Sequence, residues 1–247
     1  MAGDWGFSFA YNRPAGPILL SRARNTLLLA LPATLLAWLI ALPAGLLAAA
    51  WRSGLVDLAA DGFTSVMLAV PELVLALVLL MLAARTGYLP AGGMLSPGLQ
   101  GGSWAEGKDV ARHLLLPVVR LAVGPLPLLF AHVRAAVTDV LRSPFVMAVR
   151  SLGMPSRRVL LRHVFPAALN PLISLFGLSV GLLMSSSLLV EAIFSWPGLG
   201  PLMLQAIFDH DVFVIVDAAM LAACFLIGGN FLSDVLLYLS DPRIRAE

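Results

Sequence analysis

The sequence predicts an all-α transmembrane protein with about five membrane-spanning helices. Of its 247 residues, 60% are hydrophobic and only 12% are charged, and the mean hydropathy is +0.92. Soluble domains average about 25% charged residues. A bilayer core about 30 Å thick requires roughly 20 apolar residues of helix, and five stretches of the chain meet that requirement. This composition excludes a disordered chain, a basic nucleic-acid-binding domain and an ordinary cytosolic enzyme.

The predicted spans become more polar along the chain. The first three are almost uniformly Leu, Ala and Val, whereas the last two also carry serine, asparagine and aspartate. They cover approximately residues 26–50, 64–84, 114–133, 167–190 and 212–239. Residues 1–25 are predicted to form an interfacial lead-in with aromatic anchors, and residues 26–247 a single transmembrane domain.

Small and special residues refine this prediction. Gly177 and Gly181 form a GxxxG pair, which predicts close packing of the fourth span against another helix. The single cysteine, Cys224, excludes an intramolecular disulfide and is predicted to be a small buried residue. Prolines within or beside the spans predict kinks: they are Pro32, Pro43, Pro71, Pro117, Pro125, Pro127 and Pro171.

The distribution of Lys and Arg predicts the orientation, because these residues are enriched in cytoplasmic loops. The connection between the fourth and fifth spans has none, and Arg243 and Arg245 follow the fifth span. The connection at 134–166, between the third and fourth spans, carries Arg134, Arg142, Arg150, Arg157, Arg158 and Arg162. We therefore expect this connection and the C-terminus inside and the N-terminus outside, although Arg13, Arg22 and Arg24 oppose that arrangement locally.

Two short helices are predicted within the connection at 134–166. Ser143 and Pro144 supply an N-cap hydroxyl and a first-turn proline, and Gly153 stands where a glycine ends a helix. Pro155 starts the second helix and Pro166 ends it. The first helix has an apolar stripe at helical spacing, formed by Phe145, Ala148, Val149 and Leu152. We call residues 145–165 the knob: the spacing fits either a surface with solvated arginines or a docking element for a cytoplasmic partner.

The knob resembles the EAA loop of binding-protein-dependent ABC importer permeases. Residues 147–166 read MAVRSLGMPSRRVLLRHVFP, and the family pattern is Glu-Ala-Ala, three residues, Gly, nine residues and Ile-x-Leu-Pro. Ala148, Gly153 and Pro166 match its first alanine, its glycine and its terminal proline. The remaining defined positions are occupied by different residues, namely Met147, Val149, His163 and Phe165.

Four further stretches resemble the dipeptide, oligopeptide and nickel subfamily of these permeases. In chain order they are GDWGFSF, RARNTLLLALPATLLAWLIALPAGLLAA, VEAIFSWPGLGPLMLQAI and NFLSDVLLYLSDPRIR. The resemblance implies a type I ABC importer permease fold in which the knob is the coupling helix that sits in a cleft of the ATPase. The coupling residues that it implies are Ala148, Arg150, Gly153 and Pro166.

The resemblance also implies an assembly and a location. The partners would be a second homologous permease in a heterodimer, two cytoplasmic ATPase subunits that bind ATP and Mg, and an external solute-binding protein, all at the bacterial cytoplasmic (inner) membrane. No cofactor or metal is implied for this chain, and no nucleic acid. Subfamily permeases commonly have an additional N-terminal transmembrane helix, so the resemblance implies either a natural short form or a truncated gene model.

Polar side chains in the spans are candidates for the translocation pathway. Arg120 either snorkels to the outer surface or faces the pathway and attracts a carboxylate. Asn170 and Asp217 are further pathway candidates, with helix-end solvation or interhelical hydrogen bonding as the alternative for Asp217 and Asp234. The turn after the fourth span lies, in the family, near the docked binding protein, although by itself it is a Pro-Gly turn with an interfacial tryptophan. Its docking candidates are Glu191, Trp196, Pro197 and Gly198.

These observations favour the transmembrane subunit of an ATP-driven importer for peptides or a related small solute, nickel chelates included. The chain shows no catalytic constellation, and Gly107-Lys108 is followed by Asp109, so it has no P-loop. ATP hydrolysis is therefore expected in another chain. The competing hypotheses are an ion-coupled secondary transporter that uses Asp217 and Asp234, and a membrane-embedded enzyme or assembly factor. The inverted repeats of many secondary transporters are not evident.

Overall fold

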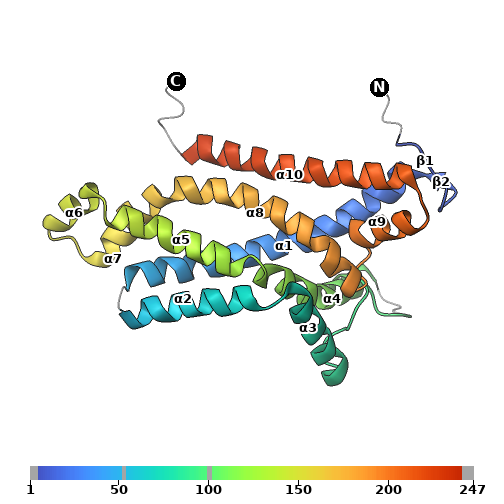
Figure 1. The fold of residues 1–247 in the computed structure, drawn as a ribbon, viewed down its shortest axis with the longest axis horizontal. Coiled ribbons are helices and arrows are strands. Elements are labelled where there is room, and N and C mark those ends of the chain that lie inside the picture. Colours follow the sequence, from blue (N-terminus) through green and yellow to red (C-terminus); the bar gives the residue numbers. More distant parts are fainter. Residues whose placement is uncertain (1–4, 52–53, 99–101, 241–247) are drawn as a thin grey trace. The chain divides into compact units, whose positions relative to one another are not determined.

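The computed structural model describes residues 5–51, 54–98 and 102–240, and Figure 1 labels their elements along the chain. The chain divides into two compact units, each built from three separate segments. Unit 1 comprises the described parts of Met1–Thr34, Pro71–Ala122 and Val180–Ile227. Unit 2 comprises the described parts of Leu35–Val70, Val123–Ser179 and Gly228–Glu247. The prediction of one domain over 26–247 stays a prediction.

The structure confirms the all-helical membrane fold. Within the described residues, three continuous helices are long and apolar enough to cross a bilayer: α1 (Ala15–Ala50), the run Ser156–Ile193 and α10 (Val212–Ser240). Two helix pairs pass the same test when each pair counts as one interrupted span. They are α2 (Gly54–Ala69) with α3 (Glu72–Thr86), and α4 (Ser103–Val123) with α5 (Leu126–Leu141). Up to five spans result, as the hydropathy predicts.

The helix boundaries correct several expectations. Among the described residues, α1 begins at Ala15, inside the predicted lead-in, and the paired two-residue strands β1 (Phe7–Ser8) and β2 (Arg13–Pro14) precede it. The second and third predicted spans are interrupted, at Pro71 and Pro125. The other prolines do not break their helices: Pro32 and Pro43 lie within α1, Pro117 within α4, Pro127 within α5 and Pro171 within α8 (Phe165–Ile193).

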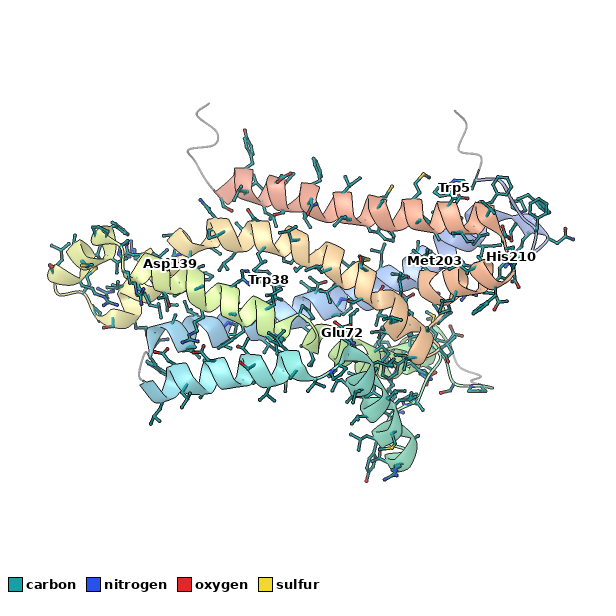
Figure 2. The ribbon with its side chains drawn as sticks, in the orientation of Figure 1. Trp5, Trp38, Glu72, Asp139, Met203 and His210 are labelled. Atoms are coloured by element: carbon teal, nitrogen blue, oxygen red, sulfur yellow. The ribbon has the colours of Figure 1, made fainter. Side chains whose placement is uncertain are left out.

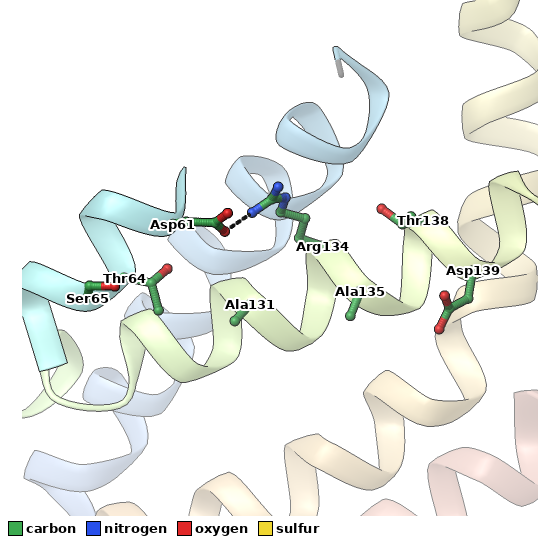
Figure 3. A pocket seen from close by; sticks show the side chains of 8 residues that line it. All are labelled: Asp61, Thr64, Ser65, Ala131, Arg134, Ala135, Thr138 and Asp139. Carbon is green, nitrogen blue, oxygen red and sulfur yellow. Dashed lines mark hydrogen bonds and ion pairs between the residues drawn. The ribbon is translucent and has the colours of Figure 1, made fainter. Parts of the chain in front are cut away.

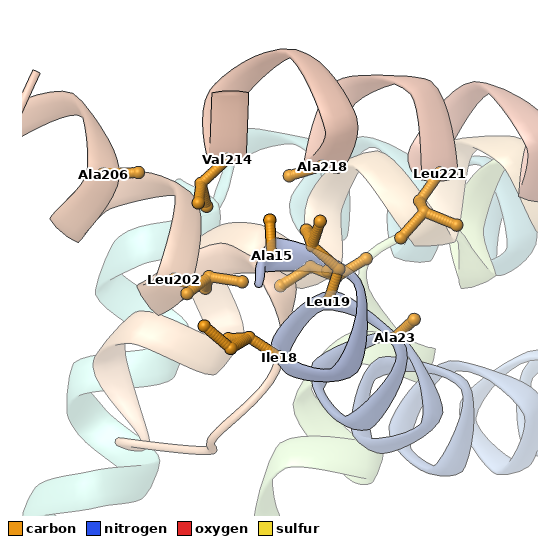
Figure 4. Packing of buried hydrophobic residues seen from close by; sticks show 10 residues of the cluster. Ala15, Ile18, Leu19, Ala23, Leu202, Ala206, Val214, Ala218 and Leu221 are labelled. Carbon is orange, nitrogen blue, oxygen red and sulfur yellow. The ribbon is translucent and has the colours of Figure 1, made fainter. Parts of the chain in front are cut away.

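Unit 1 has a core in which the first turns of α1 pack against α9 (Leu199–Phe208) and α10. Ala15, Ile18 and Leu19 of α1 contact Leu202 and Val214 in this cluster (Figure 4). Trp5 and Met203 pack against its edge (Figure 2). Burial of these apolar side chains stabilises the contact between the start of α1 and the helices α9 and α10.

Unit 2 is organised by close contacts of α1 with α5 and α8. A Cβ on Gly45 would lie 2.7 Å from Cγ1 of Val133, so α1 and α5 approach at a point that only glycine permits. Trp38 donates a hydrogen bond from Nε1 to Oγ of Ser179 at 2.9 Å and stacks edge-on against Phe176. This tryptophan satisfies its polar atom while its ring fills the interior.

The GxxxG pair behaves as predicted. A Cβ on Gly177 would lie 2.5 Å from Cβ of Ser233 within unit 2, and one on Gly181 would overlap the side chain of Leu226 within unit 1. Both glycines therefore allow α8 to approach α10 closely. The prediction for Cys224 is wrong, since this residue is exposed on α10. A helix that faces lipid is apolar all round, so hydropathy does not distinguish a lipid-facing side chain from a buried one.

Candidate coupling and translocation sites

The first helix of the knob forms as its sequence predicts. This helix, α6 (Pro144–Ser151), begins at Ser143, whose Oγ accepts a hydrogen bond from the N–H of Val146 at 3.4 Å. The helix stops at Gly153, which adopts φ of +74° and donates its N–H to the carbonyl of Arg150. This left-handed conformation costs a residue with a Cβ roughly 1–2 kcal/mol. The glycine therefore sets the angle at which the chain leaves α6.

The apolar stripe of α6 divides into an inner and an outer face. Val146 and Val149 are buried, whereas Phe145 and Leu152 are exposed, Leu152 at 77%. Ala148 lies on the exposed side with them. The ring of Phe145 also meets His163 edge-on at 6.0 Å, which holds α6 against the second half of the knob. An exposed apolar face on a short rigid helix is typical of a surface that binds a partner.

The second half of the knob differs from the prediction. Pro166 does not end a helix: α7 (Ser156–Val159), the π-helical segment η1 (Leu160–Val164) and α8 run on as one helix over Ser156–Ile193. Within η1 the N–H of Phe165 donates to the carbonyl of Leu160, an i to i−5 bond just before the proline. A π-turn can absorb the missing N–H of Pro166 without a break. The knob is thus continuous with a membrane span.

All four coupling candidates lie on the surface of the knob or at its base. Ala148, Arg150, Gly153 and Pro166 are exposed in unit 2. Nothing lies within 4 Å of the position where a Cβ would stand on Gly153. These residues are therefore accessible to a partner chain, and their role in coupling stays a prediction.

A polar groove lies between α2 and α5 in unit 2 (Figure 3). Its volume is about 440 Å³, and Ala131 and Ala135 leave room on the side of α5. The remaining lining is polar: Asp61, Thr64, Ser65, Arg134, Thr138 and Asp139. Such side chains can exchange hydrogen bonds with a polar solute, and ionisable groups inside membrane segments commonly mark a solute path.

Arg134 organises this groove. Its Nη1 and Nη2 atoms lie 2.6 Å from Oδ1 of Asp61 and of Asp57, which stand one turn apart on α2. Arg134 is 18% exposed, and Asp61 points toward it (Figure 3). One guanidinium thus faces two carboxylates, with Asp139 as a third acidic group on the groove wall. The charged groups that line the groove are therefore two carboxylates, Asp61 and Asp139, and one guanidinium, Arg134.

Sequence reasoning missed this groove. Asp57 and Asp61 precede the second predicted span, and Asp139 follows the third, so each resembles an ordinary charged residue at the end of a span. The available signal was the spacing of Asp57 and Asp61 at i and i+4, one turn before Thr64 and Ser65, which places all four near one face of a helix. The partner Arg134 lies about 75 residues away, and only the packing of α2 on α5 brings it to this face.

The structure gives Arg120 a partner that the sequence analysis did not foresee. Its side chain is only 2% exposed, so it does not snorkel to a surface. Nη2 lies 3.0 Å from Oε2 of Glu72, and Nε donates to the carbonyl of the same residue at 3.3 Å. Glu72 follows Pro71 at the start of α3, so this ion pair fixes the point where that helix begins. An anionic solute would have to compete with Glu72 for Arg120.

The other polar candidates lie in different surroundings. Asn170 is half-buried in α8 within unit 2, and Asp217 is half-buried in α10 within unit 1. Oδ2 of Asp217 is buried without a hydrogen-bond partner in the described part of the chain. Asp234 is exposed further along α10.

The turn after α8 is held from inside unit 1. Nε1 of Trp196 donates to the carbonyl of Asn25, and Nδ2 of Asn25 donates to the carbonyl of Pro197, at 2.9 and 2.8 Å. The first two N–H groups of α9 also find acceptors: Leu199 donates to Oγ1 of Thr26 at 2.9 Å, and Gly200 to a carboxylate oxygen of Glu191 at 2.7 Å. Thr26 of α1 and Glu191 of α8 thus cap α9 in place of a local N-cap side chain, and Asn25 of α1 holds the turn that leads into it.

Glu191 and Trp196, two of the docking candidates, are fully buried. A Cβ on Gly198 would lie 2.4 Å from an oxygen of Glu191, so the turn packs directly onto the carboxylate. Oε1 of Glu191 has no hydrogen-bond partner among the described residues. These side chains determine the shape of the turn. Of the other two docking candidates, Pro197 is half-buried and Gly198 is buried.

The first residues of the chain are tied to the start of α10 by Asp211. Oδ2 accepts hydrogen bonds from Oγ of Ser8 at 2.6 Å and from the N–H of Ala10 at 3.2 Å. Burial alone would raise the pKa of Asp211, but these donors, with the N–H groups of Val214 and Phe9, outweigh it and lower that pKa. The carboxylate is therefore a charged anchor outside the membrane spans.

Comparison with protein families gives a match over most of the chain. Residues 41–246 match the family described as "Binding-protein-dependent transport system inner membrane component". The oligopeptide transport system permease protein AppB of Bacillus subtilis (strain 168) is 33% identical over 245 residues, which are 98% of this chain and 76% of that protein. The di/tripeptide transport system permease protein DppB of Pseudomonas aeruginosa (strain UCBPP-PA14) is 35% identical over 240 residues, 90% of this chain and 70% of that one.

Solved structures share the fold. The MetNI methionine ABC transporter, in an inward-facing crystal form, contains a chain that superposes with a TM-score of 0.72 at 17% identity, over 92% of this chain and 97% of that one. An amino acid ABC transporter crystallised with histidines gives a TM-score of 0.64 at 19% identity, over 90% and 94%. The helices of this chain therefore follow the arrangement of ABC importer transmembrane subunits.

Proposed function

We propose, from the premise that this chain belongs to the family of binding-protein-dependent transport system inner membrane components, that it forms one half of the membrane channel of a peptide importer. The family and the fold make it the transmembrane subunit of an ABC importer. Peptides are the solute named for the relatives in Bacillus subtilis and Pseudomonas aeruginosa. The observation that carries the proposal is the rigid knob, which presents an exposed apolar face at the base of a span.

The knob transmits movement of a cytoplasmic ATPase to the membrane helices. Because Ser156–Ile193 is one continuous helix, a force on α7 acts directly on the span formed by α8. The exposed face around Ala148 and Leu152 would enter a groove of the ATPase, and Gly153 would hold α6 at the necessary angle. ATP and Mg are bound by that partner, and this chain supplies positions such as Arg150 and Pro166 to the contact.

The polar groove between α2 and α5 in unit 2 contributes to the solute pathway, and Arg120, Asn170 and Asp217 are further candidates for contacts with the solute. A peptide carries an ammonium, a carboxylate and amide groups. The groove offers carboxylates that can bind the ammonium and hydroxyls that can bind the amide groups. A second homologous permease would complete the wall, since one subunit leaves the groove open.

The knob and the C-terminus face the cytoplasm, and the turn at residues 195–200 faces outward toward a solute-binding protein. The arginines of the knob support this orientation, whereas Arg243 and Arg245 lie outside the described residues. Glu191, Trp196 and the buried Gly198 act as positioning residues, and the half-buried Pro197 is presented to the binding protein.

Uptake of a radiolabelled dipeptide and tetrapeptide tests this proposal. The full chain is reconstituted in proteoliposomes with a partner permease, an ATPase and a solute-binding protein from the same organism. The proteoliposomes are loaded with ATP or with ADP. We expect uptake when ATP is inside the vesicles and the binding protein is outside. This uptake should persist when ionophores collapse the ion gradients. Uptake that is independent of ATP but abolished by ionophores, and by Asp217→Asn with Asp234→Asn, would instead establish the secondary-transporter hypothesis.

A further inference from the structure

A second cavity lies beside the knob in unit 2, away from the polar groove. Its volume is about 430 Å³, and it lies between the last turn of α1, the end of α5 and the second half of the knob. Leu46, Leu47 and Ala50 line it from α1, and Leu160 and Leu161 from η1. Of its lining, only Arg150 was given a role above, in the contact with the ATPase.

The cavity combines an apolar wall with two cationic side chains. Arg150 and Arg157 line it and are exposed. Neither guanidinium has a hydrogen-bond or ion-pair partner in the part of the chain that the structure describes. Two guanidinium groups at the rim of an aliphatic cavity attract an anion whose remainder is apolar.

The place of the cavity fits a lipid. It lies at the end of α1, where a membrane span leaves the bilayer, and Trp51, 69% exposed, stands at its edge. Tryptophan is enriched at the level of the lipid headgroups. Basic pockets between transmembrane helices on the cytoplasmic side typically bind anionic headgroups.

We propose that this cavity is a binding site for an anionic phospholipid, whose phosphate lies between Arg150 and Arg157 and whose acyl chain lies along Leu47 and Leu161. The lipid would attach α6 to η1 and to the end of α1, and so stiffen the knob. This site is independent of which solute the chain transports. A free phosphate shares the headgroup chemistry but makes no use of the apolar wall.

Native mass spectrometry of the purified full chain in detergent tests the site. The protein is titrated with phosphatidylglycerol and with phosphatidylcholine of the same acyl chains. Phosphatidylglycerol is expected to bind about 30-fold more tightly, as two arginines near the membrane surface would give. Arg150→Gln with Arg157→Gln should abolish this preference, whereas Arg142→Gln, an exposed arginine of the same region outside the cavity, should preserve it.

A cavity-filling variant separates a lipid from a free anion. Ala50→Trp fills the apolar space and leaves both arginines in place. It should therefore weaken the binding of phosphatidylglycerol and should not strengthen the binding of phosphatidylcholine. Inorganic phosphate at millimolar concentration should not displace the lipid. Equal retention of the two lipids, displacement by phosphate, or an unchanged preference in the double arginine variant would each overturn the proposal. Circular dichroism verifies that every variant is folded.

Discussion

At the residue scale, the cap on α9 depends on side chains that are remote in sequence. Thr26 is 2% exposed, and its hydroxyl is the acceptor for the N–H of Leu199. The same helix contains a second buried threonine, Thr34, whose hydroxyl donates to the carbonyl of Ala30 one turn earlier. Removal of the Thr26 hydroxyl therefore leaves a backbone N–H without its acceptor, whereas removal of the Thr34 hydroxyl does not.

We expect Thr26→Val to lower the free energy of unfolding by about 1–2 kcal/mol, because it leaves the N–H of Leu199 buried and unpaired. The matched control, Thr34→Val, should change it by much less, since the carbonyl of Ala30 belongs to a helix that remains intact. SDS titration of the purified protein in mixed micelles measures both. Equal effects would mean that the threonines act through packing alone.

The ion pair of Arg120 with Glu72 gives a second prediction. Glu72→Gln leaves a buried guanidinium without its counter-charge, which we expect to cost on the order of 1–3 kcal/mol, less than for a fully buried pair because Glu72 is half-exposed. Glu106→Gln, an exposed acid on α4, serves as the control. If the two variants unfold at the same SDS fraction, the pair contributes nothing to stability.

Asp211 predicts a pH dependence. Because its pKa is lowered in the folded chain, its stabilisation is fully present above the ordinary aspartate pKa of about 3.9 and is lost as the pH falls through the lower folded value. Asp211→Asn should thus be less stable than wild type at pH 7, and the difference should shrink below about pH 4. Thermal unfolding of both proteins between pH 7 and pH 3 measures this. A difference that is constant over that interval would contradict the assignment.

At the scale of elements, composition predicts the helices and their order, and the prolines and glycines predict only some of their ends. Ser143, Gly153 and the GxxxG pair act as their sequence indicates, because each effect is local or depends on side-chain size alone. The start of α1 and the continuity of α7 into α8 were not predictable. Residues 15–25 are helical because they pack on α9 and α10, and Pro166 is absorbed by a π-turn.

The packing of α8 on α10 in unit 2 gives a prediction for Gly177. A methyl group there would lie 2.5 Å from Cβ of Ser233 and 3.1 Å from the carbonyl of Gly229, so the helices must move apart. We expect Gly177→Ala to destabilise the protein by about 1–3 kcal/mol through overpacking. Gly228→Ala, in α10 with open space around it, should be neutral or slightly stabilising. A stabilising Gly177→Ala, measured by SDS titration, would refute this close approach.

At the scale of the whole molecule, apolar surface remains exposed along the spans. Only 17% of the α10 window is buried inside the chain, against 44% for Ser156–Ile193. Hydropathy identifies both as spans but does not distinguish lipid contact from helix contact, which explains the wrong prediction for Cys224. The candidate site was predictable in part: the knob had a local motif, whereas the groove of Asp57, Asp61 and Arg134 depends on two helices far apart in the sequence.

The central claim is that the knob couples ATP hydrolysis to solute movement, and Gly153→Pro tests it most directly. Proline is confined to φ near −65° and lacks the N–H that binds the carbonyl of Arg150, so it cannot adopt the turn at φ of +74°. In proteoliposomes of the full importer, peptide uptake per ATP hydrolysed is measured for wild type, Gly153→Pro and the control Gly107→Ala. We expect Gly153→Pro to lower this ratio by at least about tenfold, because a penalty of ~3 kcal/mol exceeds the free energy of a tenfold change. An unchanged ratio in a folded, assembled Gly153→Pro importer would contradict the coupling role of the knob.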